Sequence, residues 1–378
     1  MDRTETLNWV EIDKRSLEHN VRLFRRLVGK ERKLMVIVKS NAYGHGMRPV
    51  SEIALASGAD SLGVFSFEEG KALREWGVKS PVLVMGYIPF SLLLHAAALD
   101  LSFAVASRET LEALLPLAGT MKARIHLKLD TGLHRLGFKL SELPLVKSLI
   151  GSTPGIEVEG LFTHFANIED TLHHEFARSQ LALFQKMAAP FMNQGKVLRH
   201  TACTAATLLF PGTHFEMVRV GIGLYGMWPS KETLITALET EKHVLNLKPV
   251  LTWKSRIIQI KKVKPGDTVG YGRSYRVTRP ARIAVLPVGY ADGYDRKLSS
   301  RGSVIIRGKE APLVGRICMN MCMADITHIP GASVEDEVIL LGTRKSASIS
   351  ADAMAELIGT INYEVTTRIN PLLPRMII

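Results

Sequence analysis

Lys39 stands in the setting that most directly suggests covalent chemistry. It follows an apolar run at residues 34–38 and precedes Ser40-Asn41-Ala42-Tyr43-Gly44-His45-Gly46, which is rich in turn-forming residues. The run lacks polar alternation, which is typical of a parallel strand covered on both faces. A desolvated lysine at the end of such a strand can lose its proton and attack a carbonyl. The strand alone favours a simpler interpretation, a lysine whose ammonium group reaches water.

Other strand-like runs also end in residues that can do chemistry. Asn41 and Tyr43 follow Lys39 after the first run, and the other runs supply Lys128, Asp130, Arg135, His164, His200, Cys203, Thr204 and Arg219, followed by Gly221-Ile222-Gly223. The hydroxyls of Tyr43 and Thr204 and the amides of Gly221 and Ile222 could together bind a phosphate. An amine beside a phosphate site suits a cofactor that is both an aldehyde and a phosphate ester, and pyridoxal phosphate fits. Each signal is weak alone, because such glycines also suit strand packing and such histidines also occur in cores.

The runs that carry these residues alternate with helical patterns. A short strand at 9–13 and a helix from Asp13 to residue 26 open the chain. Strands are then predicted at 34–39, 61–65, 82–87, 102–106, 123–129, 158–164, 199–203 and 218–224, with helices between them at 48–57, 68–76, 108–117 and 174–189. This rhythm favours a closed (β/α)8 TIM-like barrel over residues 12–240. A doubly wound open sheet is the alternative, which the eight successive strand–helix units disfavour.

A change of pattern after about residue 240 predicts a second, mainly β domain over residues 241–378, joined by a strand within residues 1–11. Strand-like runs at 254–262, 281–288, 303–307 and 335–341 are separated by turn signals such as Pro265-Gly266-Asp267 and Gly308-Lys309. A helix is expected at 350–357. The predicted fold class is therefore α/β, with an N-terminal barrel and a C-terminal β domain.

Composition excludes several classes of protein. With 378 residues, 46% hydrophobic and 22% charged, the chain can form one large and one smaller globular domain. No signal peptide or membrane span is recognisable, so a cytoplasmic protein is expected. The net charge of +12 is scattered, which disfavours nucleic acid and suits anionic small ligands. Cys203, Cys318 and Cys322 predict neither a disulfide framework nor a zinc site, and no metal is expected.

The segment Val38-Lys39-Ser40-Asn41-Ala42-Tyr43-Gly44-His45-Gly46 resembles the cofactor-lysine motif of the alanine racemases. Similar segments follow in family order along nearly the whole chain: Lys128-Leu129-Asp130-Thr131-Gly132, Arg135-Leu136-Gly137, His164-Phe165, Arg219-Val220-Gly221-Ile222-Gly223-Leu224-Tyr225-Gly226, Gly270-Tyr271-Gly272, Pro287-Val288-Gly289-Tyr290-Ala291-Asp292-Gly293 and Gly315-Arg316-Ile317-Cys318-Met319. The resemblance implies a pyridoxal phosphate enzyme that interconverts L- and D-alanine and supplies D-alanine for peptidoglycan. It also implies a homodimer whose active site is shared between subunits.

The resemblance assigns individual roles around the cofactor. Lys39 would hold its aldehyde covalently, and Arg219 would face the pyridine nitrogen, with His164 and His200 behind the arginine. Arg135 would contact the cofactor phenolate and the substrate carboxylate, and Lys128 stands where family members often carry a carboxylated lysine. The phosphate would be bound by Tyr43, Thr204, Gly221, Ile222 and Tyr363. At the substrate site, Met319 would line the pocket, and Tyr290 and Tyr363 would narrow its entrance.

Racemisation requires that the α-proton leave one face of the substrate and return to the other. By resemblance, Lys39 and Tyr271 of the partner subunit would be the two acid–base groups. A free phenol has a pKa near ~10, so Tyr271 needs cationic neighbours such as Arg135 or Arg219 to work near neutral pH. Because arginine stays protonated, Arg219 disfavours a protonated pyridine ring. The weaker electron sink that results suits simple proton exchange better than transamination.

Three positions depart from the family pattern. His134 replaces a glycine before Arg135, Cys203-Thr204 replaces Asn-Ser, and Asn320 replaces an aspartate after Met319. Threonine keeps the phosphate-binding hydroxyl. The loss of a charge at Asn320 bears on substrate preference and pH optimum more than on the reaction type.

Other functions remain as alternatives. A racemase of broader range, or one that prefers serine, would share every motif, although Tyr363 favours a small side-chain pocket. A non-catalytic carrier of the cofactor should lack the second domain and Tyr271. A decarboxylase of the same fold would want an acidic partner for the pyridine nitrogen, where this chain has Arg219.

Overall fold

The computed structural model describes residues 5–117, 122–192, 196–240 and 245–378. The chain divides into two compact units, of which one comprises Leu17–Ser40 and Met47–Lys248 and will be called the barrel unit. The other, the β unit, comprises Met1–Ser16, Asn41–Gly46 and Pro249–Ile378. The predicted domain boundary at 240/241 falls at residues 241–244, outside the described residues.

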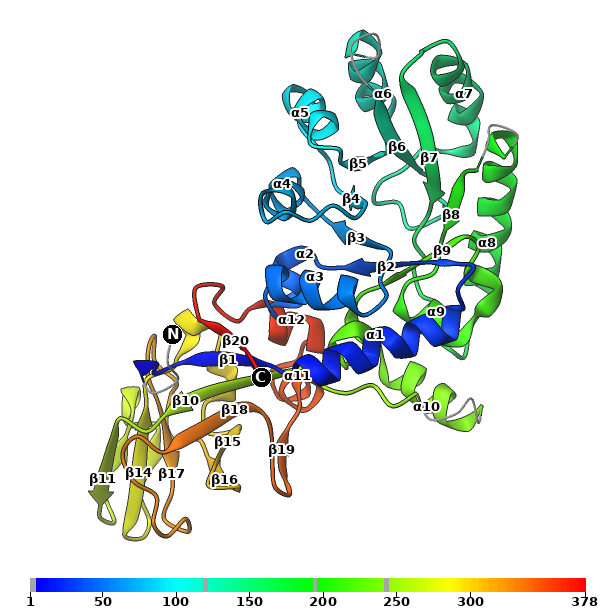
Figure 1. The fold of residues 1–378 in the computed structure, drawn as a ribbon. Helices are drawn as coiled ribbons and strands as arrows, with labels where there is room; N and C mark the ends of the chain where they lie inside the picture. The colour runs from blue at the N-terminus through cyan, green and yellow to red at the C-terminus, as the bar shows by residue number, and fades with distance from the viewer. Residues whose placement is uncertain (1–4, 118–121, 193–195, 241–244) are drawn as a thin grey trace. The chain divides into compact units, whose positions relative to one another are not determined.

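The barrel unit is built on eight parallel strands, as predicted (Figure 1). Their order around the sheet is β8-β7-β6-β5-β4-β3-β2-β9. The N–H of Arg219 donates to the carbonyl of Ala202 at 2.9 Å, which joins the two ends of the sheet and closes the barrel. The strands are β2 (Lys33–Ile37), β3 (Ser61–Val64), β4 (Val82–Val84), β5 (Ser102–Val105), β6 (Ala123–Lys128), β7 (Ile156–Phe162), β8 (Leu198–His200) and β9 (Met217–Val220).

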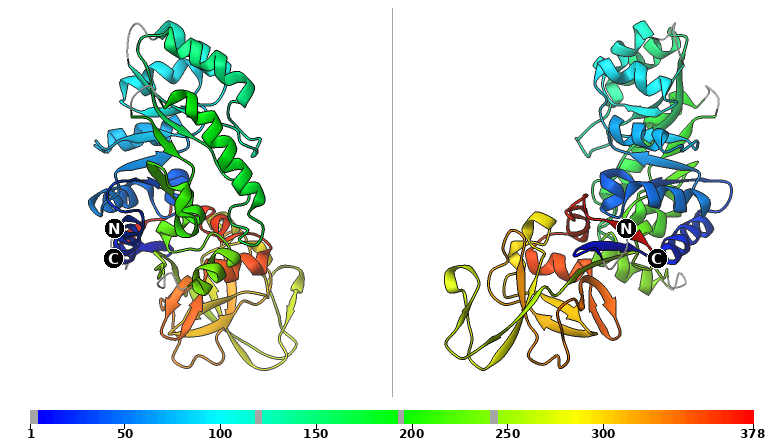
Figure 2. Two further views of the ribbon diagram at one scale, coloured as in Figure 1. Left: turned by 90° about the vertical axis from the view of Figure 1, so that its right-hand side faces the viewer. Right: turned by 60° about the vertical axis from the view of Figure 1, so that its left-hand side comes forward.

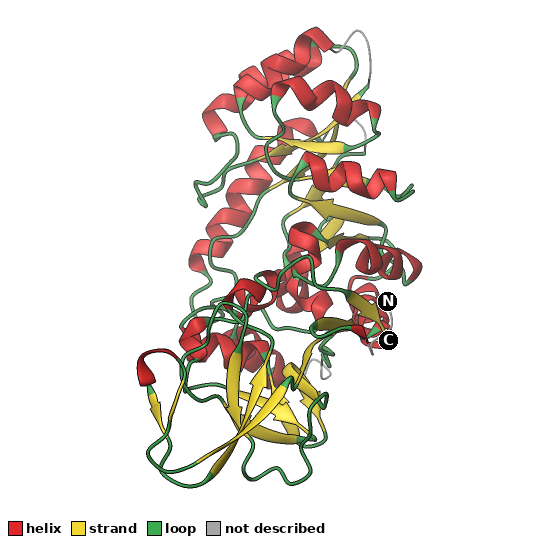
Figure 3. Ribbon diagram, turned by 90° about the vertical axis from the view of Figure 1, so that its left-hand side faces the viewer, coloured by secondary structure: helices red, strands yellow, loops and turns green. Residues whose placement is uncertain are grey.

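Helices alternate with these strands (Figure 3). Ser66 begins one of them with a capping box, because its hydroxyl accepts from the Glu69 amide while the Glu69 carboxylate accepts from the Ser66 amide. The helices are α1 (Lys14–Val28), α3 (Met47–Ala56), α4 (Phe67–Glu75), α5 (Leu93–Ala98), α6 (Arg108–Leu114), α7 (Leu143–Gly151), α8 (Glu175–Ala188), α9 (Thr204–Leu209) and α10 (Lys231–Glu239). No helix among the described residues is long and apolar enough to cross a membrane.

The predicted barrel strands lie in the right places, but most extend too far at their C-terminal ends. The first ends at Ile37 rather than at Lys39, and the last ends at Val220 rather than at residue 224. Val38 and Leu224 are nevertheless fully buried. Apolar burial thus continues into the loops at this end of the barrel, and hydrophobicity alone could not reveal where strand pairing stops.

The β unit contains three sheets (Figure 2). The largest has the order β16-β15-β18-β10-β1-β20, with β19 paired to β18; β11-β14-β17 and β12-β13 form the other two. Two helices, α11 (Ala351–Ile358) and α12 (Asn362–Thr367), complete the unit. The strands are β1 (Trp9–Ile12), β10 (Leu251–Arg256), β11 (Gln259–Val263), β12 (Thr268–Val269), β13 (Tyr275–Arg276), β14 (Ala281–Leu286), β15 (Ser303–Ile306), β16 (Lys309–Pro312), β17 (Cys322–Asp325), β18 (Glu337–Arg344), β19 (Ala347–Ile349) and β20 (Arg375–Ile377).

The single strand predicted at 254–262 is wrong, because the chain there changes from one sheet to another. Strand β10 pairs with β1 and β18, whereas β11 pairs with β14. At the junction, the Ile257 amide donates to Asp336 and the Ile258 amide donates to Val285. Ile257 therefore bonds to the residue just before β18 and Ile258 to β14, a change of partner that an uninterrupted strand pattern in the sequence does not show.

Candidate active site

Lys39 lies two residues beyond the end of β2, at the C-terminal edge of the barrel, where active sites of this architecture occur. Its side chain is partly buried. Burial, followed by the nearby charge of Arg135, lowers the pKa of its ammonium group, and Glu69 opposes this shift. A larger fraction of the amine is therefore neutral, which is the form that attacks a carbonyl.

The residues after Lys39 form a left-handed helical turn, α2 (Lys39–Tyr43), instead of an ordinary loop. The φ angles from Ser40 to Tyr43 lie between 53° and 55°. Each such residue costs about 1–2 kcal/mol relative to a right-handed conformation. Within the β unit, the Gly46 amide donates to Asn41 at 2.9 Å and closes the turn. A backbone held in so unfavourable a state indicates a functional constraint on the residues that it carries.

Gly44 is required by the packing of the β unit against this turn. Its φ is +85°, and a Cβ atom there would lie 2.0 Å from the Thr366 carbonyl oxygen. The imidazole Nδ1 of the buried His45 donates to the Tyr43 carbonyl at 3.0 Å. Burial lowers the pKa of His45 to about 3, so the ring is neutral.

Arg219, on β9, is buried in the barrel core, where several acceptors bind the two terminal nitrogens of its guanidinium. Its Nη1 donates to Nδ1 of His200 at 2.8 Å and to the His200 carbonyl, and its Nη2 donates to the Thr163 carbonyl at 2.7 Å. Nη2 also lies 3.4 Å from Nδ1 of His164. Among the described residues, Nε has no hydrogen-bond partner, which leaves one donor for a ligand. Burial lowers the pKa of Arg219 to about 10, so it stays protonated near neutral pH.

Lys128, at the end of β6, lies near Arg219 and shares an aromatic neighbour with it. Its Nζ is 4.5 Å from the ring centroid of Phe162, and the guanidinium of Arg219 is 5.5 Å from the same centroid. Burial, and then the charges of Arg219 and Arg135, lower the pKa of Lys128 well below its ordinary value. The buried amine of Lys128 therefore loses its proton more readily than that of an exposed lysine.

Arg135 is exposed on the loop that follows β6, and Asp130 shapes that loop. The Asp130 carboxylate accepts from the amides of Gly132 and His134 and from Nδ1 of His134, at 3.0–3.1 Å. His134 has a φ of +53°, a conformation that favours glycine. This conformation explains the preference for glycine at this position. In this chain, the hydrogen bonds from His134 to the Asp130 carboxylate stabilise the histidine in the same conformation.

Thr204 connects the ends of β8 and β9. Its hydroxyl accepts from the Gly221 amide at 3.1 Å and from the Gly223 amide at 3.4 Å, so three of the predicted phosphate-binding residues, Thr204, Gly221 and Ile222, lie together. The preceding residue, Cys203, points its thiol at the Glu169 carboxyl, with 3.9 Å between sulfur and oxygen. Burial, and then Glu169, raise the pKa of Cys203 to about 11, so the thiol stays protonated.

The remaining predicted site residues belong to the β unit. The rings of Tyr43 and Tyr363 lie 6.0 Å apart, with Tyr363 in the first turn of α12. The amides of Tyr290 and Ala291 donate to the carbonyls of Cys318 and Met319, which places Tyr290 beside the Met319 loop. Asn320 is exposed on that loop, and nothing in the structure explains its substitution.

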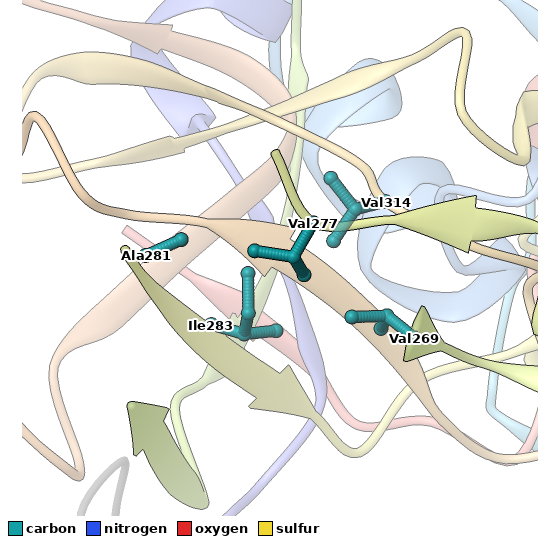
Figure 4. Packing of buried hydrophobic residues seen from close by; sticks show 5 residues of the cluster. All are labelled: Val269, Val277, Ala281, Ile283 and Val314. Carbon is teal, nitrogen blue, oxygen red and sulfur yellow. The ribbon is translucent and has the colours of Figure 1, made fainter. Parts of the chain in front are cut away.

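Tyr271 projects from a short hairpin of the β unit, and 72% of its surface is exposed. The hairpin is formed by β12 and β13 and contains two glycines with positive φ, Gly270 and Gly272. It is anchored by a buried apolar cluster that consists of Val269, Val277, Ala281, Ile283 and Val314 (Figure 4). A well-packed base thus presents a phenol that is exposed to solvent in the single chain.

Comparison with known proteins agrees with this arrangement. The model of the alanine racemase N-terminal domain matches residues 12–229, and that of the C-terminal domain matches residues 250–377. Alanine racemase from Leptospira interrogans is 39% identical over 373 residues, which cover 98% of this chain and 96% of the relative. Alanine racemase 1 from Clostridium acetobutylicum is 40% identical over 379 residues, covering 98% and 95%.

The solved structure of alanine racemase from Clostridium difficile superposes with a TM-score of 0.92 at 32% identity, covering 99% of this chain and 96% of that one. The chain belongs to the alanine racemase family. Like other members of this family, the chain is an isomerase that interconverts the enantiomers of alanine. Alanine racemase from Bacillus anthracis, solved with bound L-Ala-P, has a TM-score of 0.90 at 33% identity, covering 98% and 95%.

Enzymes of this family use pyridoxal phosphate, and the residues of the barrel unit fit that cofactor. Lys39 offers an amine of lowered pKa that suits an aldehyde, and Arg219 has an N–H that suits a ring nitrogen. The Thr204 hydroxyl accepts from the Gly221 and Gly223 amides and therefore keeps its own hydrogen to donate to the phosphate. These groups come from the ends of three different strands that meet at one edge of the barrel.

Sequence reasoning missed three residues that contact this group. Phe162 lies beneath Lys128 and Arg219, and His126 and Glu159 continue the hydrogen bonds behind His200. A signal was present in the sequence. His126 and Glu159 are polar residues inside predicted barrel strands, and polar side chains at such positions require partners once they are buried.

Proposed function

We propose that this chain racemises alanine with pyridoxal phosphate bound at the C-terminal end of the barrel, and that it supplies D-alanine for peptidoglycan. The observation that supports this most is the combination of Lys39, whose pKa is lowered by burial, with a buried Arg219 that keeps one N–H for a ligand. When bound, the cofactor supplies an electron sink that acidifies the α-proton of the substrate. The protein residues supply the position of the substrate and the transfer of its proton.

Proton transfer is divided between two residues on opposite faces of the substrate. Lys39 removes or returns the proton on one face through its Nζ, and Tyr271 of a second copy does so on the other through its hydroxyl. Arg135 binds the substrate carboxylate, and Tyr43 and Tyr363 add hydroxyls to the phosphate site. The exposure of Tyr271 in a single chain supports a homodimeric enzyme, because an exposed phenol is accessible to the active site of a second copy.

Lys128 is proposed to carry a carbamate. The neutral nitrogen of Lys128 attacks carbon dioxide, forms a C–N bond and releases a proton to solvent. The carbamate is anionic, so Arg219 and Arg135, which disfavour the ammonium form, stabilise the product. We expect protein equilibrated with ¹³C-bicarbonate to show a carbamate carbon resonance and an added mass of carbon dioxide on the peptide that contains Lys128.

Lys128→Ala should lose that resonance and lower kcat/KM by about tenfold, because Arg135 loses a charged hydrogen-bond partner. Lys122→Ala is the matched control, since Lys122 is exposed at the other end of β6. It should leave both the resonance and the activity unchanged. Absence of the added mass from active wild-type enzyme would remove the carbamate from the mechanism.

The substrate range tests the assignment of the pocket. We expect alanine to have the highest kcat/KM among alanine, serine, lysine and arginine, because Tyr290 and Tyr363 are proposed to narrow the entrance of the substrate site. One additional group in a small pocket typically costs about 10–200-fold in kcat/KM. A chiral assay of each purified amino acid measures this. Equal rates for serine and alanine would favour the alternative, a racemase of broader range.

A further inference from the structure

Behind Arg219, a continuous series of hydrogen bonds crosses the barrel core. Nδ1 of His200 lies 2.8 Å from Arg219, and Nε2 of His200 lies 2.8 Å from Nδ1 of His126. Nε2 of His126 then lies 3.1 Å from the Glu159 carboxylate. Ser102 donates to the same carboxylate oxygen at 2.5 Å. The four residues Arg219, His200, His126 and Glu159 are called the relay below.

Two local features of the strands bring His126 and Glu159 together. The pairing of β6 and β7 shifts between Ile125–Val158 and His126–Gly160, which leaves Glu159 as an extra residue on β7. Such a bulge redirects the side chains beside it. Gly160 has no side chain, and a Cβ atom there would lie 2.2 Å from Nδ1 of His126. The histidine ring therefore lies directly against the β7 backbone.

The two ends of the relay determine its proton positions. Arginine can only donate hydrogen bonds, and an ionised carboxylate can only accept them. His200 must therefore accept at Nδ1 and donate from Nε2, and His126 must do the same toward Glu159. A doubly protonated His126 would force His200 to carry its proton on Nδ1, where it would meet an arginine N–H. Both histidines are accordingly neutral Nε2–H tautomers.

Charge and burial agree with this assignment. Burial, and then the charge of Arg219, lower the pKa of His200 well below its ordinary value. Burial opposes ionisation of Glu159, but hydrogen bonds from His126 and Ser102 outweigh it and lower the pKa to about 2. The carboxylate lies on a cavity of about 170 Å³ at the N-terminal end of the barrel, which is lined by residues of all eight strands, including Ser61, Ser102 and Met217. Glu159 is thus at the opposite end of the barrel from Lys39.

We propose that Glu159 and His126 are positioning residues for Arg219. Through the relay, they keep Nδ1 of His200 unprotonated, and this nitrogen is an acceptor that orients the Arg219 guanidinium. The proposal rests on the proposed function insofar as Arg219 faces the cofactor ring. Without an ionised Glu159, either nitrogen of His126 can carry the proton. His200 then no longer has a single required tautomer, and Arg219 loses a fixed acceptor at Nη1.

The tautomers are measured first, by nitrogen NMR on the protein as purified, with ¹⁵N-labelled histidine. A scalar coupling across the His200–His126 hydrogen bond identifies the two rings among the twelve histidines. We expect both rings to be neutral Nε2–H tautomers in the wild type. Either ring in another state would overturn the relay, and this result does not depend on any variant or on cofactor binding.

Glu159→Gln is the variant that removes the charge while it keeps the shape. We expect mixed His126 and His200 tautomers, a shifted absorbance band of bound pyridoxal phosphate, and a kcat lower by about tenfold with KM little changed, as is typical of residues that orient an active-site histidine. Glu157→Gln, two residues earlier on β7 and exposed, is the control and should change none of these. Glu159→Asp keeps the ionised carboxylate and should retain the wild-type tautomers.

The outcomes separate the relay from the proposed function. Unchanged tautomers in Glu159→Gln would overturn the relay. Changed tautomers with an unaltered cofactor spectrum and kcat would overturn its coupling to the active site. Failure of the wild type to bind the cofactor would contradict the proposed function, while the tautomer measurement would still decide whether the relay exists.

Discussion

Lys39→Ala is expected to abolish racemisation and the covalent attachment of pyridoxal phosphate. The alanine variant lacks both the amine that attacks the aldehyde and one of the two proton-transferring groups. Loss of a positioned acid–base group typically costs about 10²–10⁴-fold, so we expect kcat to fall by at least about 10⁴-fold when both functions are lost. The measurements are a racemisation assay and borohydride reduction, which links the cofactor covalently to the lysine. Mass spectrometry should then find the cofactor on the peptide that contains Lys39 in the wild type and no attached cofactor in Lys39→Ala.

Lys33→Ala is the matched control for this variant. Lys33 is the first residue of β2, whereas Lys39 follows the end of that strand. The side chain of Lys33 is exposed and lies near Asp60. The control should keep cofactor attachment and activity. If Lys39→Ala still traps the cofactor on reduction, another lysine carries it and the assignment of Lys39 is wrong.

Tyr271→Phe is expected to separate the two proton-transfer steps. The variant keeps the aromatic ring and the hairpin but lacks the hydroxyl that exchanges a proton. Exchange of the α-proton with solvent deuterium should slow by about 10²–10⁴-fold for one enantiomer of alanine. It should change far less for the other enantiomer, which Lys39 serves, and the absorbance of the bound cofactor should remain.

Tyr275→Phe controls for a general effect on the hairpin. Tyr275 lies on β13, four residues after Tyr271, and packs against the apolar cluster that contains Val269. Removal of the Tyr275 hydroxyl should leave the rate of α-proton exchange unchanged for both enantiomers of alanine. Equal slowing of both enantiomers in Tyr271→Phe would count against a mechanism with two bases.

Much of the barrel could be predicted because its strands are buried on both faces and their apolar runs are separated by helical patterns. The boundaries were less accurate, since Val38 and Leu224 are as buried as the strands that they follow. In the β unit, the pattern at 254–262 joined two strands of different sheets, because the change of partner at Ile257 and Ile258 depends on residues near positions 285 and 336. Sequence periodicity records burial and contains no information on the pairing partner.

The sequence by itself determined the fold class, the family and the residues gathered at the C-terminal edge of the barrel. In a parallel barrel all strands end at one edge, so the order of the motifs is sufficient to group Lys39, Lys128, Thr204 and Arg219. Only the tertiary structure revealed the left-handed turn after Lys39 and the relay through His126 to Glu159. Both depend on contacts across the fold: the turn on packing that outweighs its unfavourable φ angles, and the relay on a shift of strand register beside Gly160.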